Sequence, residues 1–318
     1  MKTKRVLKYL IVLMCVLSLT GCVKYAKNGK KTYSNEETGQ RIVSNIICQP
    51  TNKDTLKLYD KYNKDVKKSK KINIEKLPKC KKLKLSDKYD GIWTSVFVKP
   101  LAWLIIQIGN LIKSYGLALI LTTIFIRLLV FPFTKKVAMQ SENMKKAQPE
   151  LTKLEKKYKN KSDQKEMMQK SQEMMMIYKK YNINPMSSCL FSFIQIPLFF
   201  AFYEAILRIP IIFEERFIGF DLGLSPLNAV QHGDYKYLIF IVLISASTYF
   251  SFKLNDVGAS NPEQKKQMKT MSIFMTVFMT WMSFTISTGI AFYWLTTSIF
   301  TIGQNLYVKR GKKNANNK

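Results

Sequence analysis

The chain has 318 residues, of which 47% are hydrophobic, and carries a formal net charge of +30. A basic total indicates either nucleic acid or an anionic membrane face as the partner. Because the lysines flank long apolar runs, we favour the membrane and expect no sequence-specific nucleic-acid binding. The sequence has one histidine and no cysteine–histidine cluster with the spacing of a metal site. It also has no phosphate-binding glycine loop and no nucleophile elbow. We therefore expect no metal, no cofactor and no enzyme.

Residues 1–21 are predicted to be a lipoprotein signal peptide. Basic side chains precede an apolar segment, residues 9–18, which is too short to span a bilayer comfortably. The following Leu-Thr-Gly-Cys sequence resembles the bacterial lipobox and ends at Cys22, the predicted lipidation (palmitate) site. Cleavage would make Cys22 the new N-terminus on the outer face of the membrane. The alternatives are an ordinary signal peptide and a first anchor helix.

Residues 22–90 are predicted to be an extracellular basic segment. Between residues 23 and 90, 19 lysine and arginine residues accompany 8 acidic ones, and long apolar periods are few. This composition favours a loosely folded or partly disordered segment, with lysines that are solvated or contact anionic headgroups. Cys48 and Cys80 would pair if the segment lies outside the cell, but two cysteines alone leave the pairing open.

Residues 91–115 are predicted to form an interfacial amphipathic helix. The segment contains Trp93 and Trp103, and tryptophan is typical of the membrane–water interface. A separate membrane span is the alternative, although Gly109-Asn110 and Lys113-Ser114 would interrupt it.

The first predicted span is residues 116–133, GLALILTTIFIRLLVFPF, which carries Arg127 inside an apolar helix. A bilayer core takes roughly 20 apolar residues as a helix. An arginine at its centre costs about 2.5–3.5 kcal/mol on insertion scales. Arg127 either snorkels to the headgroups, roughly 9 Å from the span's end, or faces a wet cavity inside a helix bundle, which we favour.

Residues 134–186 are predicted to form a helical hairpin on the cytoplasmic side. Apolar residues repeat at intervals of three and four on the first arm, and a second face repeats on the other arm, around a turn near residues 159–163. Pro149 is expected to kink the first helix or to start one. The alternative is a charged coiled-coil spacer, and methionine-rich faces also suit docking of varied partners. The predicted faces are Met144, Ala147, Leu151, Leu154 and Tyr158, then Met167, Met174, Tyr178 and Tyr181.

Four further apolar runs make five predicted spans within a core of residues 116–308. They cover residues 189–207, 237–254, 271–287 and 289–308. Lysine and arginine are concentrated in alternate connections, including the basic tail 309–318. By the positive-inside rule, the mature N-terminus lies outside and the C-terminus lies in the cytoplasm of a multi-pass plasma-membrane protein.

Polar residues recur at helical spacing inside these spans, which places each set on one helix face. One interpretation of these polar faces is that they form ordinary contacts between membrane helices. The other is that they line a polar groove that includes Arg127. Glu204 would pair with Arg127 only if their depths in the membrane allow it. The candidate groove residues are Arg127, Thr123, Gln195, Thr280, Ser283, Trp294, Thr297 and Thr301.

Between residues 93 and 308 the sequence resembles the YidC membrane-protein insertases. The segments that carry the resemblance include GLALILTTIFIRLLVFPF, YNINPMSSCLFSFIQIPLFFAFYEA and STGIAFYWLTTSIFTIGQN. The resemblance implies an all-α polytopic membrane protein with five transmembrane helices around a hydrophilic groove and a cytoplasmic helical hairpin. It places Arg127, Gln195 and Trp294 in that groove. Ser188 and Phe191 replace the family's usual glycine and proline, so the entry into the second span is uncertain.

The resemblance also implies the partners. The clients would be nascent membrane proteins, the basic hairpin and tail would contact the ribosome, and the protein would act alone or with the Sec translocon among membrane lipids. The alternative function is a small solute transporter or channel. Transporters tend to show internal repeats. The sequence shows no such repeat, and Pro197 of the second span has no counterpart in the fifth.

Overall fold

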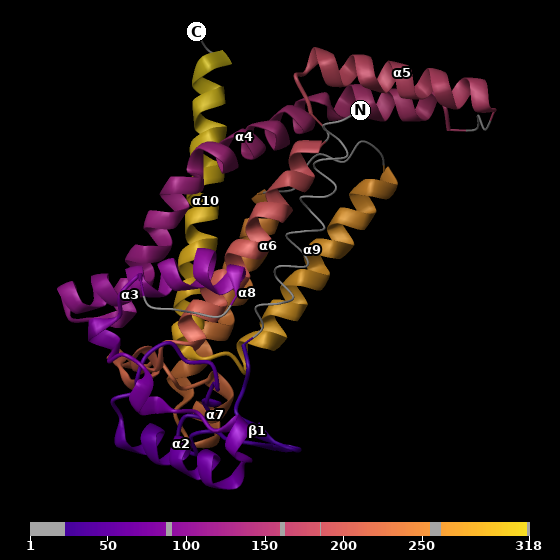
Figure 1. Ribbon diagram of the computed structural model, residues 1–318. Coiled ribbons are helices and arrows are strands. Elements are labelled where there is room, and N and C mark those ends of the chain that lie inside the picture. The colour runs from indigo at the N-terminus through magenta and orange to yellow at the C-terminus, as the bar shows by residue number, and fades with distance from the viewer. Residues whose placement is uncertain (1–22, 87–90, 160–162, 185, 255–261, 317–318) are drawn as a thin grey trace. The chain divides into compact units, whose positions relative to one another are not determined.

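The computed structural model describes residues 23–86, 91–159, 163–184, 186–254 and 262–316 (Figure 1). The predicted signal peptide and Cys22 lie outside these residues. The described chain is mostly helical, as predicted, with two short two-stranded antiparallel sheets in addition. Its contacts divide it into a first unit (residues 1–125, 194–243 and 281–296) and a second unit (126–193, 244–280 and 297–318).

Residues 23–86, which we call the N-terminal domain, begin the first unit. Strand β1 (Lys27–Asn28) pairs with β2 (Lys31–Thr32), and helix α2 (Lys53–Asp65) follows. The side chain of Asn52 caps this helix by accepting hydrogen bonds from the first free backbone N–H groups. Three short 3₁₀ turns complete the domain, namely η1 (Lys68–Lys70), η2 (Ile74–Lys76) and η3 (Cys80–Lys82).

The N-terminal domain has a core, so the prediction of a loosely folded segment is wrong. Tyr33 packs edge-on against Tyr62, with the ring centroids 5.2 Å apart. The hydroxyl of Tyr59 is buried and donates a 2.8 Å hydrogen bond to a backbone carbonyl. A disulfide joins Cys48 to Cys80, which answers the question of pairing. Buried aliphatic residues such as Ile47 and Leu83 complete the core, and the disulfide adds a covalent cross-link.

The N-terminal domain is bonded to other parts of the first unit. The backbone N–H of Ile47 donates to the carbonyl of Arg208 at 3.1 Å. The backbone N–H of Thr51 donates to the carboxylate of Glu214 at 3.0 Å. Because both contacts join residues more than 150 positions apart in the chain, the domain is an integral part of its unit.

A π-helical turn, η4 (Thr94–Val98), runs directly into α3 (Lys99–Ile112). Lys113 then ends α3 in a left-handed conformation, with φ at 56°, and α4 begins. The carboxylate of Glu215 accepts hydrogen bonds from Ser114 Oγ at 2.8 Å and from the backbone N–H of Tyr115 at 2.6 Å. A carboxylate is favourable at a helix N-terminus, which explains the start of α4 at this position.

Helix α4 (Tyr115–Lys157) contains the first predicted span and the first arm of the hairpin without a break. Pro132 and Pro149 lie inside this helix, so Pro149 does not start a separate one. Helix α5 (Gln164–Lys180) is the second arm. The predicted first face is buried, and Met144, Ala147, Leu151 and Tyr178 form a shared core.

The prediction is wrong for one residue of the second hairpin face, Met167. Met167 is 51% exposed, whereas Met174 packs partly against the core. Lys157, the last residue of α4, pairs with Glu173 at 2.7 Å. The first turns of α5 therefore extend beyond α4, and an apolar residue there has no opposing helix to cover it.

The four remaining predicted runs lie on helices α6 (Met186–Leu207), α8 (Leu238–Leu254), α9 (Pro262–Ser283) and α10 (Thr288–Asn316). Helix α9 begins nine residues before its predicted run, and α10 ends eight residues after its run. Between α6 and α8 lie η5 (Pro210–Glu214), strands β3 (Arg216–Phe217) and β4 (Phe220–Asp221), α7 (Pro226–Gln231) and η6 (Tyr235–Tyr237). The short break between α9 and α10 agrees with the predicted hairpin of the last two spans.

Three helical stretches in the described residues are long and apolar enough to cross a membrane. They are Thr94–Ile112, a window of Tyr115–Lys157, and Tyr235–Leu254, with a shorter apolar helix at Gln195–Leu207. By length and composition these stretches are candidate membrane spans, and two of them contain predicted spans, on α4 and α8. The total of five spans stays a prediction. Thr94–Ile112 is long enough to span a membrane, which fits the alternative that residues 91–115 form a separate span. The interfacial helix predicted for these residues is not tested and stays a prediction.

Candidate functional site

Four of the candidate groove residues lie in the first unit, on four different helices. The side chains of Thr123 and Ser283 are buried, and those of Gln195 and Trp294 are partly buried. The hydroxyl of Thr123 donates to the carbonyl of Leu119 at 2.7 Å, a bond within its own helix that leaves the hydroxyl little need for another partner. The Trp294 ring lies edge-on to Phe199, with centroids 5.4 Å apart.

The other four candidates lie in the second unit. Arg127 of α4 is 4% exposed, although it stands in an apolar stretch of the helix. Thr297 and Thr301 of α10 are buried, and the hydroxyl of Thr301 donates to the carbonyl of Thr297 at 2.8 Å. The hydroxyl of Thr297 is buried and has no hydrogen-bond partner among the described residues. This face of α10 therefore carries a buried hydroxyl that no hydrogen bond within the helix satisfies.

Further polar contacts surround these candidates in the second unit. Thr134 donates from its hydroxyl to the side-chain oxygen of Gln304 at 2.7 Å, which joins α4 to α10. The hydroxyls of Ser245 and Thr280 lie 2.7 Å apart and join α8 to α9. Asn305, which the sequence analysis did not single out, is also buried. Thr280 thus contacts another helix directly, as the helix-contact interpretation expects.

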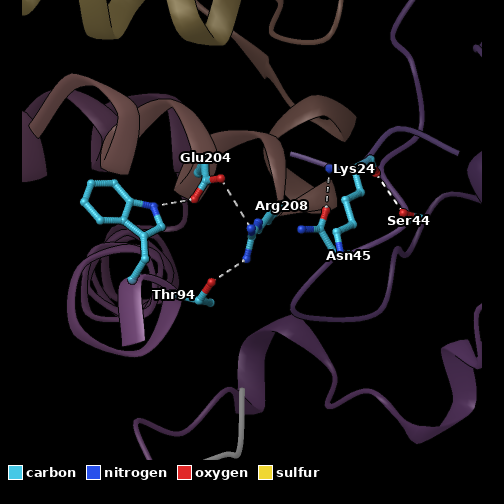
Figure 2. Close-up of polar contacts among 7 residues, drawn as sticks. Lys24, Ser44, Asn45, Thr94, Glu204 and Arg208 are labelled. Carbon is cyan, nitrogen blue, oxygen red and sulfur yellow. Dashed lines mark hydrogen bonds and ion pairs between the residues drawn. The ribbon is translucent and has the colours of Figure 1, made fainter. Parts of the chain in front are cut away.

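The first unit contains a buried ion pair that sequence analysis missed. Glu204 and Arg208 lie four residues apart on α6, with Oε1 and Nη2 separated by 3.4 Å (Figure 2). The indole N–H of Trp93 donates to the other carboxylate oxygen of Glu204 at 2.8 Å. Arg208 also donates to the hydroxyl of Thr94 at 3.2 Å. All four side chains are buried.

This cluster shows where the Glu204 carboxylate is bonded. The sequence analysis considered only Arg127 as its partner, whereas the structure pairs it with Arg208 and Trp93. The four-residue spacing of Glu204 and Arg208 on one helix was the available signal. The hydrogen bonds of Trp93 and Thr94 to this pair join η4 to α6. Removing one partner of the pair would leave the other as an uncompensated buried charge.

The comparison with known proteins concerns most of this helical region. The family described as 60Kd inner membrane protein matches residues 107–316. A membrane protein insertase YidC of Oceanobacillus iheyensis is 36% identical over 226 residues, covering 70% of this chain and 85% of the relative. Membrane protein insertase YidC 2 of Bacillus anthracis is 35% identical over 228 residues, covering 71% and 84%. Membrane protein insertase MisCA of Bacillus subtilis is 34% identical over 218 residues, covering 68% and 79%.

Proposed function

The chain belongs to the YidC membrane-protein insertase family, and on that premise we propose that it inserts nascent membrane proteins through a polar groove within its helices. Five helices enclose the groove, namely α4, α6, α8, α9 and α10. The groove residues are Arg127, Thr123, Gln195, Thr280, Ser283, Trp294, Thr297 and Thr301. The observation that carries the proposal is the burial of Arg127, at 4% exposure, within an apolar helix.

The burial of Arg127 argues against snorkelling as its role. A snorkelling side chain keeps its charged head in water at the membrane surface, whereas a buried guanidinium group needs acceptors or water within the protein. The hydroxyl of Thr297, in the same unit, is also buried and has no hydrogen-bond partner among the described residues. A wet interior would satisfy this hydroxyl and hydrate the guanidinium group.

The mechanism follows from the cost of moving polar groups through lipid. An unsatisfied polar group in the hydrocarbon costs several kcal/mol, and a wet groove shortens the distance that a client's polar outer segment must cross. Arg127 attracts acidic residues of this segment because Coulomb forces are stronger at a reduced dielectric. The client's apolar helix then moves into lipid, driven by hydrophobic burial. No covalent bond is made or broken.

The remaining parts of the proposal concern topology and partners. Cys22 is lipidated and holds the mature N-terminus outside, and the C-terminus is cytoplasmic. The α4–α5 hairpin and the basic tail face the cytoplasm and contact the ribosome, and the Sec translocon takes part with some clients. The Leu-Thr-Gly-Cys sequence supports the lipidation, and the distribution of lysine and arginine along the chain supports the orientation. The partners rest on the family resemblance.

The test uses two matched clients, identical single-span proteins whose outer segments carry either acidic residues or their amide counterparts. Insertion into liposomes that contain only this protein is compared between wild type and Arg127→Ala. We expect the variant to insert the acidic client about ten-fold more slowly, the effect of losing roughly 1.4 kcal/mol of attraction. We expect much less change with the amide client.

Arg127→Lys keeps the charge and serves as the rescue variant, and Lys153→Ala removes an exposed charge from α4 as the control. If Arg127→Ala slows both clients equally, charge attraction is not the role of Arg127. If it slows neither, the arginine has no part in insertion.

A further inference from the structure

An apolar crevice of about 270 Å³ lies between α4 and α10 in the second unit. Its walls come from both helices, and Thr134 and Gln304 bond to each other beside it at 2.7 Å. The side-chain oxygen of Gln304 thus accepts a hydrogen bond from the hydroxyl of Thr134. The lining residues are Leu128, Phe131, Phe300, Gly303, Gln304 and Tyr307.

Gly303 keeps the crevice open. A Cβ atom built on this glycine would meet no atom within 4 Å, so the space above it is empty. Glycine inside a helix costs about 1 kcal/mol relative to alanine, and no close helix packing at Gly303 offsets that cost. The missing side chain instead leaves room for an external group.

The crevice is lined by side chains of only two helices, and apart from Gln304 and the hydroxyl of Tyr307 its lining is apolar. An acyl chain is much narrower than a helix. The apolar walls favour such a chain through hydrophobic burial.

Positive charge lies at one end of the crevice. Lys135 Nζ is 5.6 Å from the ring centroid of Tyr307, and Phe131 packs against the same ring at 6.1 Å. Lys309 and Arg310 follow Tyr307 and are exposed. The sequences 126–141 and 297–318 contain no aspartate or glutamate, so an anion at this end meets no acidic residue from either stretch.

We propose that this crevice is a binding site for one anionic phospholipid. An acyl chain lies over Gly303, and the phosphate group lies near Lys135, where the exposed ring of Tyr307 suits the level of the headgroups. Anionic lipid is attracted by each nearby lysine or arginine. The site rests on the proposed membrane placement of α4 and α10, but not on the insertion mechanism.

The experiment measures lipid retention by native mass spectrometry. The full-length protein is purified in detergent, stripped of lipid, and titrated with phosphatidylglycerol or phosphatidylcholine of identical acyl chains. We expect one phosphatidylglycerol to be retained in preference to phosphatidylcholine. Lys135→Gln should lower this preference about five-fold, the effect of one lysine near an anionic headgroup.

Gly303→Leu fills the crevice and should reduce retention of both lipids. Gly311→Leu and Lys153→Gln are the matched controls, because a Cβ at Gly311 also meets nothing within 4 Å and Lys153 is exposed on the hairpin arm. Both controls should retain lipid as wild type does. The proposal is overturned if wild type does not prefer phosphatidylglycerol, or if Lys135→Gln and Gly303→Leu both behave as wild type.

Retention is measured without a client, so it is independent of insertion. If the variants lose the lipid but still insert clients, the lipid site and the insertase function both stand. If an apolar client peptide displaces the retained lipid, the crevice takes clients, and the lipid proposal is wrong.

Discussion

The N-terminal domain and the α4–α5 hairpin are both rich in lysine, but different interactions hold them together. In the hairpin, Met144, Ala147 and Leu151 are spaced three and four residues apart on α4, and they pack against one face of α5. In the N-terminal domain, a similar period on α2 and its C-cap (Tyr59, Tyr62 and Val66) supplies only part of the core, and residues of irregular segments and a disulfide supply the rest. Net charge therefore says little about order here, because a few buried side chains and one cross-link decide it.

The two regions also share a surface feature. In each of them a carboxylate accepts hydrogen bonds from one lysine and one tyrosine. The three groups are Asp65 with Lys31 and Tyr33, Glu150 with Lys180 and Tyr181, and Glu173 with Lys157 and Tyr158. Because exposed ion pairs contribute little to stability, these groups are expected to matter less than the cores.

Removing the disulfide should have the largest effect and should separate the two regions. Cys48→Ser with Cys80→Ser opens a cross-link between residues 32 positions apart. Chain entropy then predicts a loss of about 3–4 kcal/mol of stability in the N-terminal domain. Hydrogen exchange of residues 23–86 should become faster, whereas exchange in the α4–α5 hairpin should stay unchanged. Equal protection in the variant and wild type would mean that the noncovalent core suffices.

Leu151→Ala should have the next largest effect, and it should act on the hairpin alone. Leu151 is 1% exposed in the shared core of α4 and α5, and we expect a loss of about 2–3 kcal/mol because a two-helix core can partly collapse. Hydrogen exchange of α5 would report it. Met168→Ala, at an exposed position of α5, is the control. Similar exchange in both variants would contradict the assignment of the core.

Tyr59→Phe tests the polar part of the N-terminal core. The substitution removes the hydroxyl that donates to the carbonyl of Val43 at 2.8 Å and leaves a buried acceptor unsatisfied. We expect a loss of about 1–2 kcal/mol, smaller than the loss of the disulfide. The midpoint of urea unfolding, followed by exchange of residues 23–86, measures it. An unchanged midpoint would show that another donor replaces the hydroxyl.

Acid should weaken both regions by the smallest amount. A hydrogen bond from Lys31 holds the pKa of Asp65 below its ordinary value, and Lys180 and Lys157 do the same for Glu150 and Glu173. A carboxylate with a lowered pKa in the folded state stabilises above its unfolded pKa, about 4, and this stabilisation is lost as the pH falls through the folded value. The expected result is slightly faster exchange of both regions at pH 3 than at pH 6, after correction for intrinsic rates. Asp65→Asn should remove this dependence from the N-terminal domain only, and an unchanged dependence in that variant would contradict the assignment.

The sequence predicted the helices better than it predicted the contacts. The apolar runs placed α6 and α8 within a few residues of their observed bounds, because a long apolar run is a local signal. They missed the start of α9 and the end of α10, where the helices continue through polar residues. The pairing of Glu204 with Trp93 was not predictable, since it joins residues 111 positions apart on segments whose packing no local pattern specifies. Arg127 and Thr297 are buried, and their place in a polar groove stays a prediction. The core of the N-terminal domain was missed although Tyr59, Tyr62 and Val66 repeat at intervals of three and four, because its other buried residues lie in irregular segments among many lysines.

The most direct test of the account is insertion by the purified protein alone. Liposomes that contain only this protein are compared with empty liposomes for insertion of a small single-span client, measured by protection of its translocated segment from protease. The account predicts clear protection with the protein and only background protection without it. Protection no greater than in empty liposomes would contradict the proposal that this chain inserts such a client through its own groove.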